Sequence, residues 1–278
     1  MPCYSLKCDR GPSTALEKRC HGPSSALAAE LARFSSTSPP RPQQKKTQRP
    51  VLTALFDCLR RAHASPAALA IVVTGSGSKA FSAGFDINQF AKSGGGGGID
   101  NRINDAFCEL LESGAKPTVA AVRGLALGGG LEVALACNAR VATKGTKLGL
   151  PELQLGILPG FGGTQRLPRL VGKAKALELL LSADMIPAQE AYRIGLINKL
   201  VPEGEVVKAA RDLAKRILGK GQVAVRLIME SVDDGLKTTL EKGLLIEAEN
   251  FGKVMGSADA TEGVSAFLQK RQAKFQDR

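Results

Sequence analysis

A run of three glycines at residues 128–130 constrains the fold of this chain more than any other feature of its sequence. Each glycine lowers the stability of a helix or strand, so such a run is expected where the backbone must come close to something else. If a helix begins here, its first amide groups have no partner within the helix and are directed outward. The run therefore predicts a helix whose N-terminus forms part of a site, against the plainer interpretation of a loop.

Two glutamates in apolar surroundings follow these glycines. Glu132 falls in the first turn of the expected helix, and Glu152 follows twenty residues later in the string LGLPE. Paired carboxylates in an apolar setting near exposed amides are the ingredients of acid–base chemistry on a carbonyl compound. Taken singly, each has a plainer interpretation, because a first-turn glutamate commonly balances the helix dipole and a glutamate after proline commonly begins a surface helix. The order and spacing of the whole string favour the chemical interpretation.

The length of 278 residues suits one large domain, or a domain with an appendage. A hydrophobic content of 44% supports a core, and with 4% aromatic residues and no Trp that core must be aliphatic. The net charge of +12 is compatible with a solvated basic surface or with an anionic partner, and nucleic acid is the weaker option because no basic run is interleaved with aromatic residues. No apolar run reaches the length of a membrane span.

Cysteine and histidine usage argues against several kinds of site. None of the six cysteines forms a C-x-x-C pair, and Cys58, Cys108 and Cys137 lie among apolar residues, which is typical of buried thiols in a reducing compartment. The only histidines are His21 and His63, too few for a histidine-based metal site or a catalytic triad. We therefore expect no metal.

Apolar periodicity predicts alternating strands and helices, which is typical of α/β folds with crossover units. The expected strands cover residues 70–74, 118–123, 140–143, 147–150 and 196–201, and the expected helices cover residues 51–62, 171–181 and 188–194, with others after the glycines and around residues 103–111. Residues 75–80 fit G-x-G-x-x-A after a strand, but they lead into a second turn instead of an apolar helix. This context argues against a dinucleotide-binding turn.

The two ends of the chain differ from this middle part. Residues 1–50 are rich in Ser, Pro, Lys and Arg, which predicts disorder, with a targeting presequence and a short helix over residues 26–34 as further interpretations. From residue 205 onward the pattern is helical, with one face expected to be buried. The expected buried positions on that face are Leu213, Ile217, Val225, Ile228, Leu240, Leu244, Phe251, Val254, Val264 and Leu268.

Four motifs, in this order, resemble those of the crotonase superfamily, the enoyl-CoA hydratase/isomerase fold. They are AFSAGFDI at residues 80–87, GLALGGGLE at 124–132, LGLPE at 148–152 and PGFGGTQRL at 159–167. The resemblance extends from about residue 51 to the C-terminus. The sequence GFDIN at residues 84–88 most resembles the hydratase part of peroxisomal multifunctional β-oxidation proteins.

The resemblance implies an α/β fold, the crotonase (ClpP-like) spiral of ββα units, over residues 51–203. A C-terminal helical region over residues 204–278 would then cover the site and form a trimer interface. Members of the family open with a β-hairpin, whose strands are not recognisable within residues 1–50. We therefore expect the sheet edge at residues 70–74 to be uncovered.

The resemblance also implies an activity, the hydration of a 2-trans-enoyl-CoA in fatty-acid β-oxidation. The backbone amides of Phe85 and Gly129 would receive the charge of the thioester oxygen, Glu132 would activate water, and Glu152 would protonate Cα. The positions expected to contact the substrate are Ser82, Ala83, Asp86, Ile87, Gly128, Pro151 and Gly160. Coenzyme A is part of the substrate, so no separate cofactor is expected.

Two alternatives stay open at this point. A Δ3,Δ2-enoyl-CoA isomerase needs a carboxylate only at the Glu152 position, and an inactive crotonase-like subunit lacking the first strands would serve assembly alone. In either case the family implies a homotrimer or hexamer, and a peroxisomal or mitochondrial location.

Overall fold

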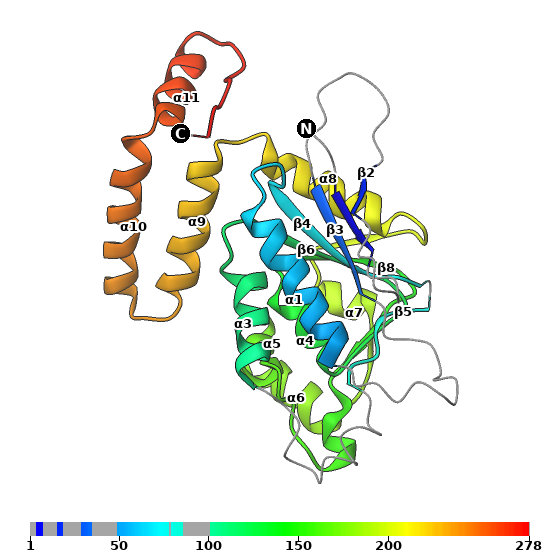
Figure 1. Cartoon of the computed structure of the whole chain (residues 1–278). Helices are drawn as coiled ribbons and strands as arrows, with labels where there is room; N and C mark the ends of the chain where they lie inside the picture. The colour runs from blue at the N-terminus through cyan, green and yellow to red at the C-terminus, as the bar shows by residue number, and fades with distance from the viewer. Residues whose placement is uncertain are drawn as a thin grey trace.

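The computed structural model places the chain in two β-sheets surrounded by helices (Figure 1). It describes residues 4–7, 16–18, 29–34, 49–77, 79–85 and 101–277, with residues up to 51 and residues 101–105 described by their backbone alone. The larger sheet has the strand order β11 (Lys199–Val201), β8 (Ala139–Thr143), β6 (Thr118–Val122), β4 (Ala70–Gly75), β3 (Ala29–Phe34), β1 (Tyr4–Lys7) and β2 (Leu16–Lys18). The smaller sheet has the order β10 (Ile186–Pro187), β9 (Lys147–Gly149), β7 (Leu125–Leu127) and β5 (Ala80–Ser82).

Helices follow these strands along the chain. They are α1 (Arg49–Ala64), α3 (Asn101–Glu112), α4 (Gly129–Ala136), the 3₁₀ helix η1 (Pro151–Leu155), α5 (Gly163–Val171), α6 (Lys173–Ser182), α7 (Ala188–Arg193), α8 (Val206–Leu218), α9 (Gln222–Gly235), α10 (Leu240–Met255) and α11 (Ala258–Leu268).

The chain coils so that each turn adds a strand to each sheet and then a helix. β4, β5 and α3 form one such turn, β6, β7 and α4 form the next, and β8 and β9 begin a third. Neighbouring turns pair in parallel, β4 with β6 and β6 with β8 in the larger sheet, and β5 with β7 and β7 with β9 in the smaller one. The predicted spiral of ββα units is confirmed.

The central strands of the larger sheet are buried on both faces. Along β4, Ile71 and Val73 contribute to the core that includes residues of α1, α3 and α4, whereas Ala70 and Val72 contribute to the core under α8. A strand covered on both sides has no polar face, which explains the continuous apolar run that predicted this strand.

Helix α4 lies at the centre of the molecule, and all eight of its residues are buried. Its C-terminal carbonyl groups are satisfied by Arg140 from β8, whose side chain is 3% exposed. The Arg140 Nη1 donates to the carbonyls of Ala134, Leu135 and Cys137, and its Nε donates to that of Leu196. A cation at a helix C-terminus also complements the helix dipole, so this buried arginine stabilises α4 in two ways.

The prediction of disorder over residues 1–50 is wrong for the three strands within it. β3 forms where a short helix was expected over residues 26–34, and it pairs in parallel with the whole of β4, so the edge expected to be uncovered is covered. Residues 26–34 read ALAAELARF, a short mixture of apolar and charged residues that is compatible with either a helix or a strand. The partner of β3 follows only after α1, so local sequence does not reveal the pairing. Residues 49 and 50 begin α1, and the rest of this segment lies outside the described residues.

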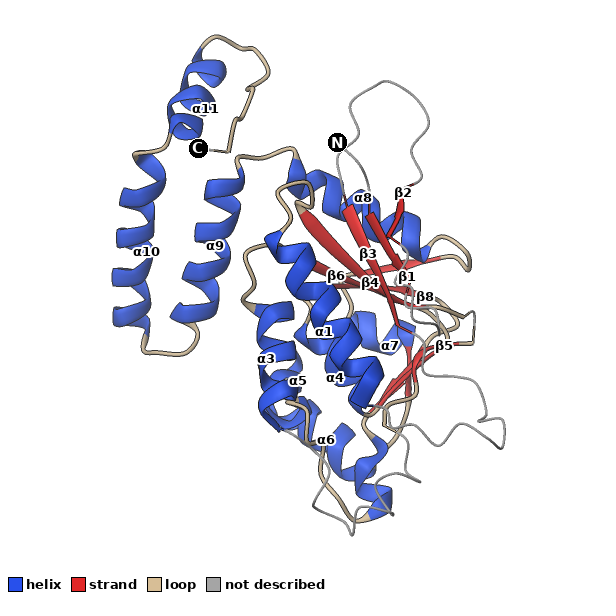
Figure 2. Ribbon diagram, in the orientation of Figure 1, coloured by secondary structure: helices blue, strands red, loops and turns tan. Residues whose placement is uncertain are grey.

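The expected burial along the C-terminal helices is also partly wrong. α8 packs on the larger sheet, whereas Figure 2 shows α9, α10 and α11 standing to one side of the two sheets. Several positions expected to be buried are exposed in the single chain, namely Ile228, Leu240, Leu244, Phe251, Val264 and Leu268. Periodicity identifies an apolar face but not what covers it, and none of the described residues of the chain covers this face.

Removing the buried guanidinium should destabilise the fold. We expect Arg140→Met to lower the free energy of unfolding by roughly 3 kcal/mol or more, because it leaves buried carbonyl groups without a donor. The control is Arg193→Met, which removes an exposed arginine paired with Glu190 and should cost at most about 0.5 kcal/mol. Chemical denaturation measures both. Equal losses in the two variants would contradict this role of Arg140.

Candidate functional site

The glycine run forms the junction between β7 and α4. Gly128 has a φ of 53°, a left-handed conformation that side chains rarely adopt, and its N–H donates to the carbonyl of Gly149 at 3.0 Å. A Cβ on Gly130 would lie 2.5 Å from the carbonyl oxygen of Ser82, so only glycine lets the start of α4 approach the end of β5. The predicted helix with a glycine-rich N-terminus is confirmed.

The loop after β5 lies against this N-terminus. An ideal Cβ on Gly84 would lie 3.3 Å from the amide nitrogen of Gly129, and a Cβ on Gly129 would lie 2.7 Å from the ring of Phe85. Phe85 and Gly129, the two residues expected to offer amides, are therefore neighbours. The Phe85 ring also packs edge-on against Phe161, with centroids 5.8 Å apart.

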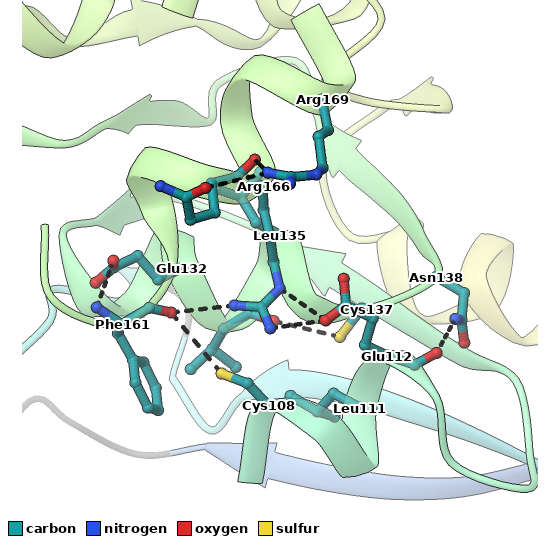
Figure 3. Close-up of polar contacts among 12 residues, drawn as sticks. Cys108, Leu111, Glu112, Glu132, Leu135, Cys137, Asn138, Phe161, Arg166 and Arg169 are labelled. Atoms are coloured by element: carbon teal, nitrogen blue, oxygen red, sulfur yellow. Dashed lines mark hydrogen bonds and ion pairs between the residues drawn. The ribbon is translucent and has the colours of Figure 1, made fainter. Parts of the chain in front are cut away.

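Glu132 is buried one turn into α4 and is held by two backbone amides. Its Oε1 accepts hydrogen bonds from the N–H groups of Phe161 and Gly163, both at 2.7 Å, and Figure 3 shows the contact with Phe161. Burial raises the pKa of Glu132 to about 7, against the lowering effect of these two hydrogen bonds, and the nearby Glu152 raises it further. Its Oε2 lies toward Gly129, 3.8 Å from an ideal Cβ there.

Glu152 reaches the same glycines from η1. Its Oε1 lies 2.9 Å from an ideal Cβ on Gly128, and its Oε2 is buried with no hydrogen-bond partner among the described residues. Burial raises the pKa of Glu152 as well. The two carboxylates thus meet at the N-terminus of α4, Glu152 beside Gly128 and Glu132 beside Gly129.

The remaining positions expected to contact the substrate differ in how deeply they are buried. Ser82 is buried, and its hydroxyl accepts a hydrogen bond from the Gly84 N–H at 3.2 Å, so its side chain shapes the loop. Ala83 and Gly160 are exposed, while Pro151 is half-buried as the first residue of η1. The other two expected positions, Asp86 and Ile87, lie outside the described residues.

A family model described as enoyl-CoA hydratase/isomerase matches residues 41–278. The chain belongs to this family. A crotonyl-CoA hydratase from Syntrophomonas wolfei is 44% identical over 228 residues, which cover 81% of this chain and 86% of that protein. A short-chain-enoyl-CoA hydratase from Clostridium acetobutylicum is 42% identical over 73% of this chain and 78% of that protein.

The crystal structure of an enoyl-CoA hydratase from Bacillus anthracis has the same fold as this family member, with a TM-score of 0.76 and 35% identity. The match covers 84% of this chain and 90% of that chain. A glyoxysomal fatty acid β-oxidation multifunctional protein from Cucumis sativus is 51% identical over 172 residues, which are 60% of this chain but 24% of that protein. The crotonase fold and the likeness to multifunctional proteins are both confirmed.

Sequence reasoning on this family member missed what holds Glu132. The turn at residues 161–163 was recognised only as part of a motif, yet it supplies both amides to the carboxylate. It also missed Arg166, which contacts the Phe161 carbonyl and Glu112. Gly162 and Gly163, at the start of α5, were a local signal for a tight turn, but nothing local pairs Arg166 with α3.

Within the described ranges, no group of His, Cys, Asp and Glu residues is arranged to hold a metal ion. Among the helices of those ranges, none has both the length and the apolar character needed to cross a membrane.

The raised pKa of Glu132 should make stability depend on pH in a defined direction. Because the folded value of about 7 exceeds the ordinary 4.5, the folded chain binds this proton more tightly. The resulting stability is present at low pH and is lost as pH rises through 7. We expect Glu132→Gln, which cannot titrate, to gain stability relative to wild type between pH 5 and pH 8, by at most about 3 kcal/mol.

Urea denaturation at the two pH values measures this gain. Glu247→Gln, on the exposed surface of α10, is the control and should show no comparable change. A pH-independent difference between Glu132→Gln and wild type would contradict a raised pKa.

Proposed function

We propose that this chain adds water to 2-trans-enoyl-CoA thioesters in fatty-acid β-oxidation, as an enoyl-CoA hydratase. The observation that carries the proposal is the meeting of Glu132 and Glu152 at the glycine-rich N-terminus of α4. The names of the bacterial relatives, crotonyl-CoA hydratase and short-chain-enoyl-CoA hydratase, support the same reaction.

The backbone amides of Phe85 and Gly129 are proposed to bind the thioester oxygen. This oxygen gains negative charge as water attacks C3, and the N-terminus of α4 adds the favourable end of the helix dipole. Preorganised donors of this kind are typically worth about 2.7–4 kcal/mol each in the transition state. The positions around them that would contact the CoA ester are Ser82, Ala83, Asp86, Ile87, Gly128, Pro151 and Gly160.

The two carboxylates divide the proton transfers. Glu132, with Oε1 fixed by two amides, takes a proton from water as the water oxygen bonds to C3. Glu152 gives its proton to C2, so that one water is added across the double bond. Burial raises the pKa of Glu152, which favours the protonated form that this step needs. These steps use no metal and no cofactor apart from the CoA of the substrate.

The isomerase alternative rests on Glu152 alone. Such a reaction moves a proton between two carbons and needs no activated water, so the buried Glu132 would have no direct part in it. The inactive-subunit alternative is weakened, because it assumed that the first strands are missing, and β3 covers the edge of β4.

The apolar face of the last helices supports a homotrimer or a hexamer built from trimers. Apolar side chains that are more than half exposed lie in one stripe along α9 and the residue after it, in one stripe along α10, and on α11. They are Ile228, Val232, Leu236, Leu240, Leu244, Phe251, Met255, Val264, Phe267 and Leu268. Exposed apolar side chains in this number are typical of an interface between subunits. For the location of the enzyme, a peroxisome or mitochondrion is proposed, and a fluorescent fusion tests it.

Each carboxylate should be needed for hydration. We expect Glu132→Gln and Glu152→Gln each to lower kcat for crotonyl-CoA by at least roughly 10²-fold with little change in KM. Loss of the enoyl absorbance measures the rate. A near wild-type kcat in either variant would contradict the proposed pair. Loss in Glu152→Gln alone, with isomerisation of a 3-enoyl-CoA retained in Glu132→Gln, would identify an isomerase.

The proposed assembly predicts a solution mass of three or six chains. Placing charge on the apolar stripes, as in the double variant Ile228→Asp, Leu244→Asp, should shift the mass toward one chain, because charge buried in an interface is costly. Tyr192→Asp, at an exposed aromatic residue on α7, is the control and should keep the wild-type mass. Light scattering after gel filtration measures all three, and a monomeric wild-type protein would overturn the assembly proposal.

A further inference from the structure

The guanidinium group of Arg166 lies inside the turn that holds Glu132. Its Nη1 donates to the carbonyl of Phe161 at 3.3 Å, and the same nitrogen fills the space that a Cβ on Gly162 would need. Gly162 has a φ of 97°, so both its conformation and its lack of a side chain are required here. The turn is therefore wrapped around the arginine.

The opposite side of this turn carries the donors to the carboxylate. The N–H groups of Phe161 and Gly163 both point to Oε1 of Glu132, and the carbonyl bound by Arg166 lies between them along the chain. Moving that carbonyl would rotate the peptide planes on either side of it. The contact with Arg166 thus fixes the direction of both amides.

Arg166 is itself held from α3. Its Nε and Nη2 both donate to Oε2 of Glu112, at 3.1 and 2.7 Å, and the backbone carbonyl of Glu112 accepts from the Asn138 side chain at 2.8 Å (Figure 3). Asn138 lies just beyond the end of α4. The connection from α3 through Arg166 to the turn therefore ties together the elements on both sides of Glu132.

We propose that Arg166, oriented by Glu112, is a positioning residue for Glu132: it fixes the turn that binds the carboxylate and supplies a positive charge beside it. This inference rests on the proposed role of Glu132 as the base that activates water. Arg166 contacts neither of the reacting carboxylates directly and acts through the backbone of Phe161 and through its charge.

The charged and titratable groups around Glu132 come from three neighbouring elements. Glu152 on η1 raises the pKa of Glu132, and Arg166 on α5 lowers it. On α3, Glu112 pairs with Arg166, and burial raises the pKa of Cys108 to about 12, so this thiol stays neutral. Arg166 is the cation among them, and its removal should shift the ionisation of Glu132 to higher pH.

The dependence of kcat/KM on pH for crotonyl-CoA hydration tests the proposal. In Arg166→Gln the acidic limb of the kcat/KM–pH profile, which reports the ionisation of Glu132, should move to higher pH by about half a unit or more. In the same variant kcat should fall by a larger factor than KM changes. Arg166→Lys keeps the positive charge but not the planar guanidinium group with its several donors. This variant should therefore show a smaller shift of the acidic limb and still have a lower kcat. Arg169→Gln is the control, because this exposed arginine on the same helix bonds only to Gln165 among the described residues.

A well-folded Arg166→Gln with the wild-type limb would overturn the proposal. If Arg166→Gln does not fold, the test passes to Arg166→Lys and Glu112→Gln. A wild-type kcat and a wild-type acidic limb of the pH profile in both of these variants would also overturn the proposal. If the wild-type chain itself does not hydrate crotonyl-CoA, the proposed function falls, and with it the base role on which this inference rests. A shifted limb in Arg166→Gln beside an unchanged Arg169→Gln supports it.

Discussion

The structure depends on holding a buried carboxylate, that of Glu132, at one point beside the start of α4. A charge in this position is costly unless hydrogen bonds compensate it, and the two amides of the 161–163 turn do so at 2.7 Å each. The compensation is incomplete, because burial still raises the pKa of Glu132 to about 7. A carboxylate poised near neutral pH can accept a proton and release it again, which is what acid–base chemistry requires.

The spiral explains how such a site can be built from distant parts of the chain. Strands of the smaller sheet end beside one another, so the segments that follow β5, β7 and β9 bring Phe85, Gly129 and Glu152 to one place. Glycine at positions 84 and 130 then permits backbones to approach more closely than side chains would allow, and glycine at position 128 leaves room for the Glu152 carboxylate. The fully buried α4, with Arg140 at its C-terminus, anchors the whole arrangement in the core.

Local sequence predicted the parts whose causes are local. The glycine run, the apolar setting of Glu132 and the continuous apolar strand over residues 70–74 each carry their own physical reason, and each was recovered in the fold. What failed depends on contacts between distant segments. The pairing of β3 with β4, the ion pair of Arg166 with Glu112 and the uncovered face of α9 to α11 all involve partners that periodicity cannot identify. Motif resemblance supplied the positions of the site residues but not the network that holds them.

The most direct test of this account is a measurement of the ionisation of Glu132 itself. Protein labelled with ¹³C at the glutamate carboxyl carbon can be titrated by NMR, with the Glu132 signal assigned by its absence from Glu132→Gln. We expect a midpoint near 7 for this buried carboxylate held by the two amides. A midpoint at the ordinary glutamate value of about 4.5 would show that the site is open to water and would contradict this account.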